Sequence, residues 1–138
     1  MKKRRELNKR LKRVWEKLEE LLMATKNDIS MVGFAIVAYA GDAKSDLIEA
    51  LNQARDKNFD KARELVESAN QNIVEAHNEQ TSLLTQEAGG AEMDVTFIMV
   101  HGQDTLMTTM MLKDQVEYFI NEYERLAKIE ERLDKAGL

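Results

Sequence analysis

Apolar residues recur at steps of three and four along most of this chain, and no proline interrupts them. A period near 3.6 residues is typical of an amphipathic α-helix, and proline is the residue that most strongly breaks one. Three such runs follow one another, at about residues 29–54, 62–84 and 95–133. Helices of this length would each span about 40–50 Å. The chain is therefore predicted to be all-α.

Two short segments separate the predicted helices. The sequence Lys-Asn-Phe-Asp at residues 57–60 indicates a turn, with Asp60 as the N-cap of the second helix. Gly89 and Gly90 are expected to end that helix. Short connections make consecutive helices antiparallel neighbours. The expected architecture is thus an antiparallel three-helix bundle with long helices.

The third helix carries more apolar residues than one buried face requires. They surround it almost completely between residues 97 and 112: Phe97, Ile98, Met99, Val100, Leu106, Met107, Met110, Met111 and Leu112. Two partner helices cannot cover such a surface, so a homo-oligomer is expected in which third helices meet on the symmetry axis. In the first helix, Gly33 and Gly41 are expected to mark close approach of a neighbouring helix.

One polar stripe interrupts this apolar helix. His101, Asp104, Thr105 and Thr108 are spaced i, i+3, i+4 and i+7, which places them on one face. Gly102 is expected to keep the surroundings of the imidazole open to an incoming group. The alternatives are a structural histidine with satisfied hydrogen bonds and, for Asp104, an ordinary solvated charge.

Composition excludes several kinds of chemistry. The 138-residue chain has no cysteine, so disulfides, thiolate metal sites and cysteine nucleophiles are absent. No apolar run approaches the ~18 residues of a transmembrane helix, and the charged start lacks the apolar core of a secretory signal. A soluble cytoplasmic protein without membrane insertion is expected.

Several separated motifs, taken together, resemble one known family. They are Gly33-Phe34-Ala35-Ile36 with Gly41-Asp42-Ala43, Asn58-Phe59-Asp60, Glu75-Ala76-His77 with Gln80-Thr81, His101-Gly102-Gln103-Asp104, Leu106-Met107-Thr108-Thr109 and Leu112-Lys113-Asp114. In this order they resemble the enzyme IIA component of the lactose/cellobiose (chitobiose) class of bacterial sugar phosphotransferase systems. The resemblance covers about residues 29–127.

The resemblance implies a phosphocarrier. His101 would accept a phosphoryl group from the histidine-containing phosphocarrier protein and pass it to a cysteine of enzyme IIB. It also implies a homotrimer with His101 in a cleft between subunits, and Asp104 at the axis as a ligand of a metal ion, Mg²⁺. Imidazole is largely neutral at pH 7 and can attack phosphorus. Gln103 and the hydroxyls of Thr105 and Thr108 are candidates for stabilising the transferred group.

Two further residues bear on this site. His77 either borders the same cleft from the second helix or is a plain bundle histidine. The family commonly has a second histidine directly after the aspartate, where this chain has Thr105. This departure removes a proton carrier beside the nucleophile, and a slower transfer is one expected consequence.

The first 22 residues differ from the rest. They hold nine Lys/Arg and four Asp/Glu, a net charge of +5, while the remaining residues have a net charge of −10. Their apolar residues form a heptad stripe: Leu7, Leu11, Val14, Leu18 and Leu21. The chain is thus divided into a basic amphipathic helical extension, residues 1–22, and an enzyme IIA-like bundle, residues 23–138, with Met23 as the expected start.

Three interpretations of residues 1–22 stay open. The segment is an engineered helix that directs packing or binds a designed partner, a natural partner-binding or coiled-coil extension, or a basic face for nucleic acid or an anionic membrane. Nucleic-acid binding is not expected, because the heptad stripe already indicates a protein partner. The alternative function for the whole chain is an engineered trimeric scaffold, or assembly component, built on this fold.

Overall fold

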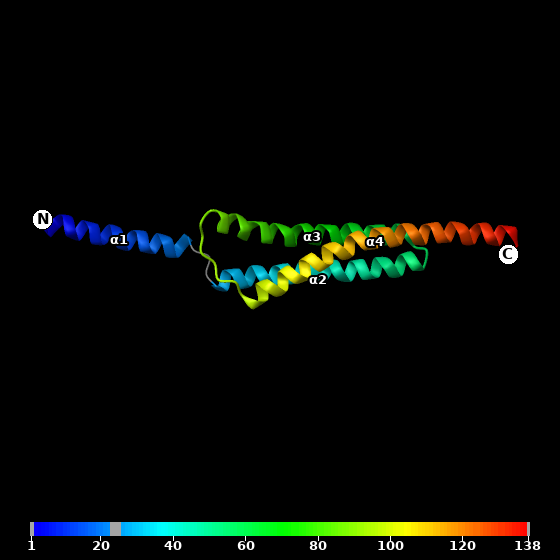
Figure 1. The fold of residues 1–138 in the computed structure, drawn as a ribbon, viewed down its shortest axis with the longest axis horizontal. Coiled ribbons are helices and arrows are strands. Elements are labelled where there is room, and N and C mark those ends of the chain that lie inside the picture. Colours follow the sequence, from blue (N-terminus) through cyan, green and yellow to red (C-terminus); the bar gives the residue numbers. More distant parts are fainter. Residues whose placement is uncertain (1, 23–25, 138) are drawn as a thin grey trace.

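The computed structural model describes residues 2–22 and 26–137, and its regular elements in these ranges are four α-helices. They are α1 (Lys2–Leu22), α2 (Lys26–Arg55), α3 (Phe59–Ala88) and α4 (Phe97–Ala136). α2, α3 and α4 form the predicted antiparallel bundle, and α1 extends from one of its ends (Figure 1). The expected start of the bundle at Met23 lies outside the described residues.

The core is built around α2, which packs extensively on both α3 and α4, while α3 and α4 contact each other less. One face of α2 is buried at the predicted spacing: Ile29, Gly33, Ile36, Ala40, Ala43, Leu47, Ala50 and Ala54. Most of these side chains are small, so the neighbouring helices approach closely. Leu106, Val116 and Ile120 of α4 fill the remaining space and are fully buried.

The turn between α2 and α3 differs from the prediction by two residues. Asn58 is the N-cap, because its carbonyl accepts the first helical bond from the N–H of Ala62, so the assignment of the cap to Asp60 is wrong. Phe59 already packs against the core, which starts α3 earlier. Asp60 instead lies in the first turn, where a carboxylate favours the helix dipole. The predicted end of α3 at Gly89 is confirmed.

α4 begins at Phe97, two residues later than predicted, because the Thr96 hydroxyl accepts a hydrogen bond from the Met99 N–H at 3.3 Å and caps the helix. It continues for 40 residues, against 30 each for α2 and α3. Its carboxyl-terminal turns therefore project beyond the α2–α3 turn (Figure 1). Gly137, with φ of 71°, ends α4 in the left-handed conformation.

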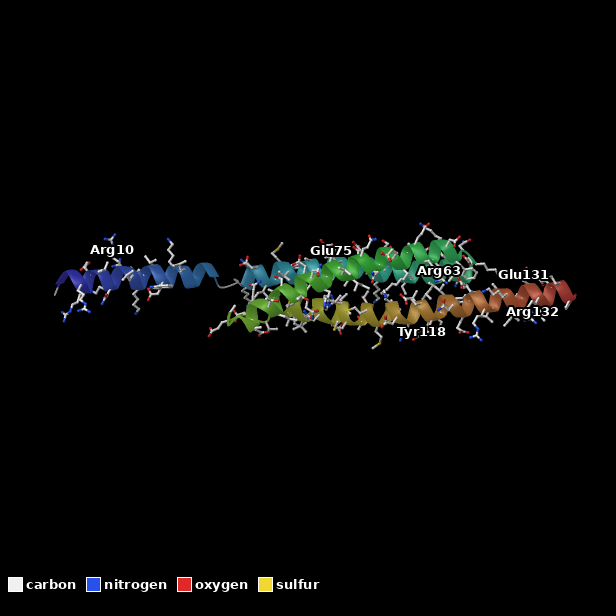
Figure 2. The ribbon with its side chains drawn as sticks, turned by 90° about the horizontal axis from the view of Figure 1, so that it is seen from above. Arg10, Arg63, Glu75, Tyr118, Glu131 and Arg132 are labelled. Carbon is white, nitrogen blue, oxygen red and sulfur yellow. The ribbon has the colours of Figure 1, made fainter. Side chains whose placement is uncertain are left out.

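α1 is helical as predicted but contacts none of the other described helices. Its side chains, Arg10 among them, project freely from the ribbon (Figure 2). Leu7, Leu11, Val14, Trp15 and Leu18 are all exposed, so the heptad stripe packs against none of the other described helices. The side chains of Leu21 and Leu22 lie outside those described. Among the described helices, none combines the length and hydropathy needed to cross a bilayer.

Candidate phosphoryl-transfer site

His101 lies in the second turn of α4, with its side chain exposed. The next residue, Gly102, is buried against α2: a Cβ built on it would stand 3.0 Å from the carbonyl oxygen of Gly33. A Cβ on Gly33 would stand 3.0 Å from the backbone nitrogen of Met99. The two glycines thus allow the backbones of α2 and α4 to touch directly beside the imidazole.

These contacts decide three expectations about glycines. Close approach at Gly33 is confirmed. Close approach at Gly41 is wrong, because nothing lies within 4 Å of a Cβ built there. The expectation that Gly102 opens the surroundings of His101 is also wrong, because Gly102 faces α2. The imidazole of His101 is accessible because it lies on the side of α4 that α2 and α3 leave uncovered.

The polar stripe is present as predicted, but its hydroxyls are bonded to the helix itself. The Thr105 hydroxyl donates to the His101 carbonyl at 2.8 Å, and the Thr108 hydroxyl donates to the Asp104 carbonyl at 2.8 Å. Such bonds to the preceding turn are common for threonine in helices. Donation to a phosphoryl group would require either hydroxyl to rotate away from its carbonyl.

Asp104 is exposed in the middle of an apolar seam on α4. The large apolar side chains of this seam are exposed in a single chain: Phe97, Val100, Met107, Met111 and Tyr118. Phe97 is 90% and Met111 64% exposed. Exposed apolar patches of this kind mark interaction surfaces.

A metal ion at Asp104 would need ligands beyond one chain. No cluster of three or more His, Cys, Asp or Glu side chains suited to a metal exists within residues 2–22 and 26–137. Mg²⁺ prefers six oxygen ligands. Asp104 belongs to no such cluster among the described residues, so the residues fit the ion only where several copies bring their Asp104 side chains together.

Gln103 lies on a different face from His101. Residues two apart are separated by about 200° around a helix, so one chain does not bring these two side chains together. Gln103 is half-buried against α3, where its Oε1 accepts a hydrogen bond from Nε2 of Gln80. Both glutamines line a mainly apolar cavity of about 200 Å³ between α3, α4 and the residues before α4. Leu84 also lines it and is exposed.

Gln80 carries no separate signal in the sequence. It is part of one of the family motifs, but on its own it resembles an ordinary polar surface residue of a helix. Its pairing with a residue 23 positions away is visible only in three dimensions. His77 is exposed one turn before Gln80, so the single chain does not bury it as a core histidine.

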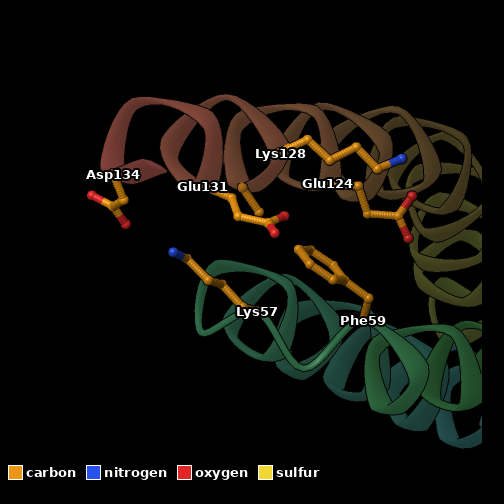
Figure 3. Close-up of a pocket in the computed structure, with 7 residues that line it drawn as sticks. Lys57, Phe59, Glu124, Lys128, Glu131 and Asp134 are labelled. Atoms are coloured by element: carbon orange, nitrogen blue, oxygen red, sulfur yellow. The ribbon is translucent and has the colours of Figure 1, made fainter. Parts of the chain in front are cut away.

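A second cavity, of about 580 Å³, lies far from His101, between the α2–α3 turn and the carboxyl-terminal half of α4 (Figure 3). Lys57, Phe59, Glu124, Lys128, Glu131 and Asp134 line it. The Lys57 ammonium lies 2.7 Å from the Glu130 carboxylate, and this hydrogen bond and charge raise the pKa of Lys57 above its usual 10.5. The Lys57–Glu130 ion pair thus links the α2–α3 turn to α4 beside this cavity.

The fold and the site define a class of protein: an all-α bundle of three long helices that presents an exposed histidine beside an exposed carboxylate and an exposed apolar seam. The model of the family described as "PTS system, Lactose/Cellobiose specific IIA subunit" matches residues 31–124. The chain belongs to this family of phosphotransferase-system components.

Its relatives agree with this assignment. The lactose-specific EIIA component of Lacticaseibacillus casei is 64% identical over 111 residues, which cover 80% of this chain and 99% of that protein. The lactose-specific EIIA component of Staphylococcus epidermidis is 52% identical over 100 residues, covering 72% of this chain and 96% of that protein.

Solved structures share the fold. The cellobiose-specific enzyme IIA of Bacillus anthracis has a TM-score of 0.71 at 31% identity and covers 77% of this chain and 95% of that one. The chitobiose-specific IIA of Escherichia coli, solved in solution as a complex with HPr, has a TM-score of 0.63 at 30% identity. It covers 72% of this chain and 96% of that one.

Proposed function

We propose that this protein is a phosphocarrier in which His101 bears the phosphoryl group. A ring nitrogen of His101 attacks the phosphorus of a phosphohistidine donor, so that one P–N bond forms as another breaks. The group then passes to a cysteine thiolate of enzyme IIB, forming a P–S bond and regenerating the imidazole. The observation that carries this proposal is the exposed His101 in a family motif, in a chain with only two histidines.

The donor we propose is HPr, the histidine-containing phosphocarrier protein. The E. coli chitobiose-specific IIA, which shares this fold, was solved in complex with HPr. Enzyme IIB is the acceptor that the family assignment supports. Both exchanges are proposed to occur in the cytoplasm.

We propose a homotrimer assembled through the α4 seam. With Asp104 facing a three-fold axis, His101 lies about 60° to one side and Gln103 about 100° to the other side of each α4. In a three-fold ring every subunit presents one flank to the opposite flank of its neighbour. His101 of one copy would therefore face Gln103 of the next, and the proposed role of Gln103 in stabilising the phosphoryl group is exerted between copies.

At the axis, three Asp104 carboxylates would repel one another in an apolar seam. We propose that Mg²⁺ binds there, because a hard divalent cation accepts carboxylate oxygens and relieves this repulsion. Thr105 occupies the position where family members commonly carry a second histidine. Its hydroxyl cannot act as a base near pH 7, so transfer here depends on His101 itself.

The test is phosphorylation with phosphoenolpyruvate, enzyme I and HPr, followed by mass mapping of the label. One phosphoryl group per chain is expected on His101, and His101→Ala should abolish it. His77→Ala is the matched control, because it removes the chain's other imidazole and should leave the label in place. Label that persists in His101→Ala would overturn the assignment.

The second candidate function is an assembly component, favoured by α1, whose exposed apolar stripe contacts no other described helix. In this alternative, α1 directs packing or binds a designed partner, and phosphotransfer is incidental. Deleting residues 2–22 and measuring the solution mass tests it. Loss of an assembly larger than a trimer would support the scaffold function, and an unchanged trimer would remove it.

A further inference from the structure

The hydrogen bond between Gln80 and Gln103 determines which end of the Gln103 amide stays available for phosphoryl transfer. Nε2 of Gln80 donates to Oε1 of Gln103, which uses the acceptor end of the Gln103 amide. None of the hydrogen bonds among the described residues uses Nε2 of Gln103. The amide is therefore held with its donor end available.

The apolar surroundings of the two glutamines strengthen this hydrogen bond. Both side chains are half-buried and line the same mainly apolar cavity, with Leu83 and Met99 beside them. A hydrogen bond is stronger in such surroundings than in water, and turning the Gln103 amide alone would set two N–H donors against each other. Gln80 thus holds the Gln103 amide in position and, while Gln80 donates, leaves Nε2 of Gln103 on the side away from this bond.

A phosphoryl group on a histidine presents oxygen acceptors only. A side chain that meets it must therefore offer an N–H or O–H donor already aimed at it, because stabilisation by fixed donors requires no rearrangement during transfer. An amide free to rotate could also present its carbonyl oxygen, which cannot donate a hydrogen bond to the phosphoryl oxygens.

We propose that Gln80 is a positioning residue for phosphoryl transfer: by donating to Oε1 of Gln103, it aims Nε2 of Gln103 at the phosphoryl group on His101 of the adjacent copy. This inference rests on the proposed function of His101. Gln80 does not touch the reacting atoms. It acts through Gln103.

The experiment measures steady-state phosphoryl transfer from phosphorylated HPr through the full-length chain to an excess of enzyme IIB, so that the chain turns over, for wild type and five variants. Gln80→Met keeps the length of the side chain but removes its donor, and Gln80→Glu offers a carboxylate that attracts the Gln103 amide nitrogen and reverses the amide. Gln103→Met and the double variant Gln80→Met/Gln103→Met complete a cycle. Gln71→Met is the matched control, since Gln71 lies on an exposed part of α3 and bonds only to Glu67 of its own helix among the described contacts.

We expect Gln80→Met to lower kcat about tenfold with little change in KM for HPr, and Gln80→Glu to lower it further. Gln80→Met should add no further loss once Gln103 is Met. Melting temperatures report separately on structure, and Gln71→Met should match wild type in all readouts.

Two results would overturn the inference. One is wild-type kcat in Gln80→Met; the other is an undiminished loss when Gln103 is already Met, since Gln80 would then not act through Gln103. Failure of the wild-type chain to label at His101 contradicts the proposed function instead, so the two failures are distinguishable.

Discussion

Gly33 and Gly102 place the backbones of α2 and α4 in direct contact one residue from His101. A Cβ on either glycine would stand about 3.0 Å from a backbone atom of the opposite helix, closer than real Cβ atoms normally come. The position of the imidazole is thus set by main-chain packing that cannot adjust by a side-chain rotation.

The first prediction concerns these glycines. Gly102→Ala should lower the free energy of unfolding by about 1–3 kcal/mol, because the helices must separate to admit the methyl group. It should also slow phosphorylation of His101. Gly41→Ala is the control: nothing lies within 4 Å of its Cβ, so it should stabilise α2 by about 0.5–1 kcal/mol. Urea unfolding of wild type, Gly102→Ala and Gly41→Ala measures the two changes in the free energy of unfolding. Equal changes for the two variants would contradict the packing argument.

The second prediction concerns the α4 seam. Met111→Lys should convert the trimer to monomers, because it places three like charges together where three apolar side chains are proposed to meet. Ile48→Lys on α2 is the control, as Ile48 is also apolar and exposed but lies off the seam. Light scattering gives the mass of each variant. A trimer that survives Met111→Lys would show that the copies meet elsewhere.

The third prediction concerns Asp104 and Mg²⁺. Chelation should lower the melting temperature of the wild type, and excess Mg²⁺ should restore it. Asp104→Asn should be insensitive to both treatments and more stable than the metal-free wild type, because the repulsion is gone. Each kcal/mol relieved corresponds to about 2–4 °C. A wild type whose melting is unaffected by chelation would argue against an axial cation.

The fourth prediction follows from the raised pKa of Lys57. A raised folded-state pKa means that the Lys57–Glu130 pair stabilises the fold fully below the unfolded pKa of 10.5 and loses this effect as pH rises through the folded value. Lys57→Met should therefore be less stable than wild type near neutral pH, and the difference should shrink as the pH rises above 10.5 and through the raised pKa of Lys57 in the folded state. The effect is small because both side chains are exposed. Urea titrations at several pH values follow it, and a difference constant with pH would exclude the ion pair as its source.

The helices were predictable because period and proline content act locally. Their ends were less so: Asn58 caps α3 instead of Asp60, since the packing of Phe59 decides where the helix starts. Gly33 and Gly41 look alike in sequence, yet only one meets another backbone. Sequence spacing records which residues share a face, but not which part of that face another helix covers.

The candidate site, like the fold, was predictable from the sequence only in part. His101 and Asp104 stood out because polar residues interrupt an apolar run. Gln103 is adjacent in sequence and yet lies on another face, bonded to a residue of α3. No local pattern encodes such a pairing, because it arises from how α3 and α4 lie against each other. The arrangement between copies depends in addition on symmetry, which a single chain does not contain.

Because α4 extends beyond the α2–α3 turn, His101 and the carboxyl-terminal turns of α4 lie at opposite ends of the bundle. His101 lies near the start of this helix, and Leu133 is 32 residues further on, about 48 Å away along the axis. HPr and enzyme IIB, the proposed donor and acceptor, would meet the imidazole at one end of the bundle and leave the other end free. A tether, label or surface attached after Ala136 would thus hold the carrier without shielding its reactive group, so that a population fixed by this end could still be charged and discharged from solution.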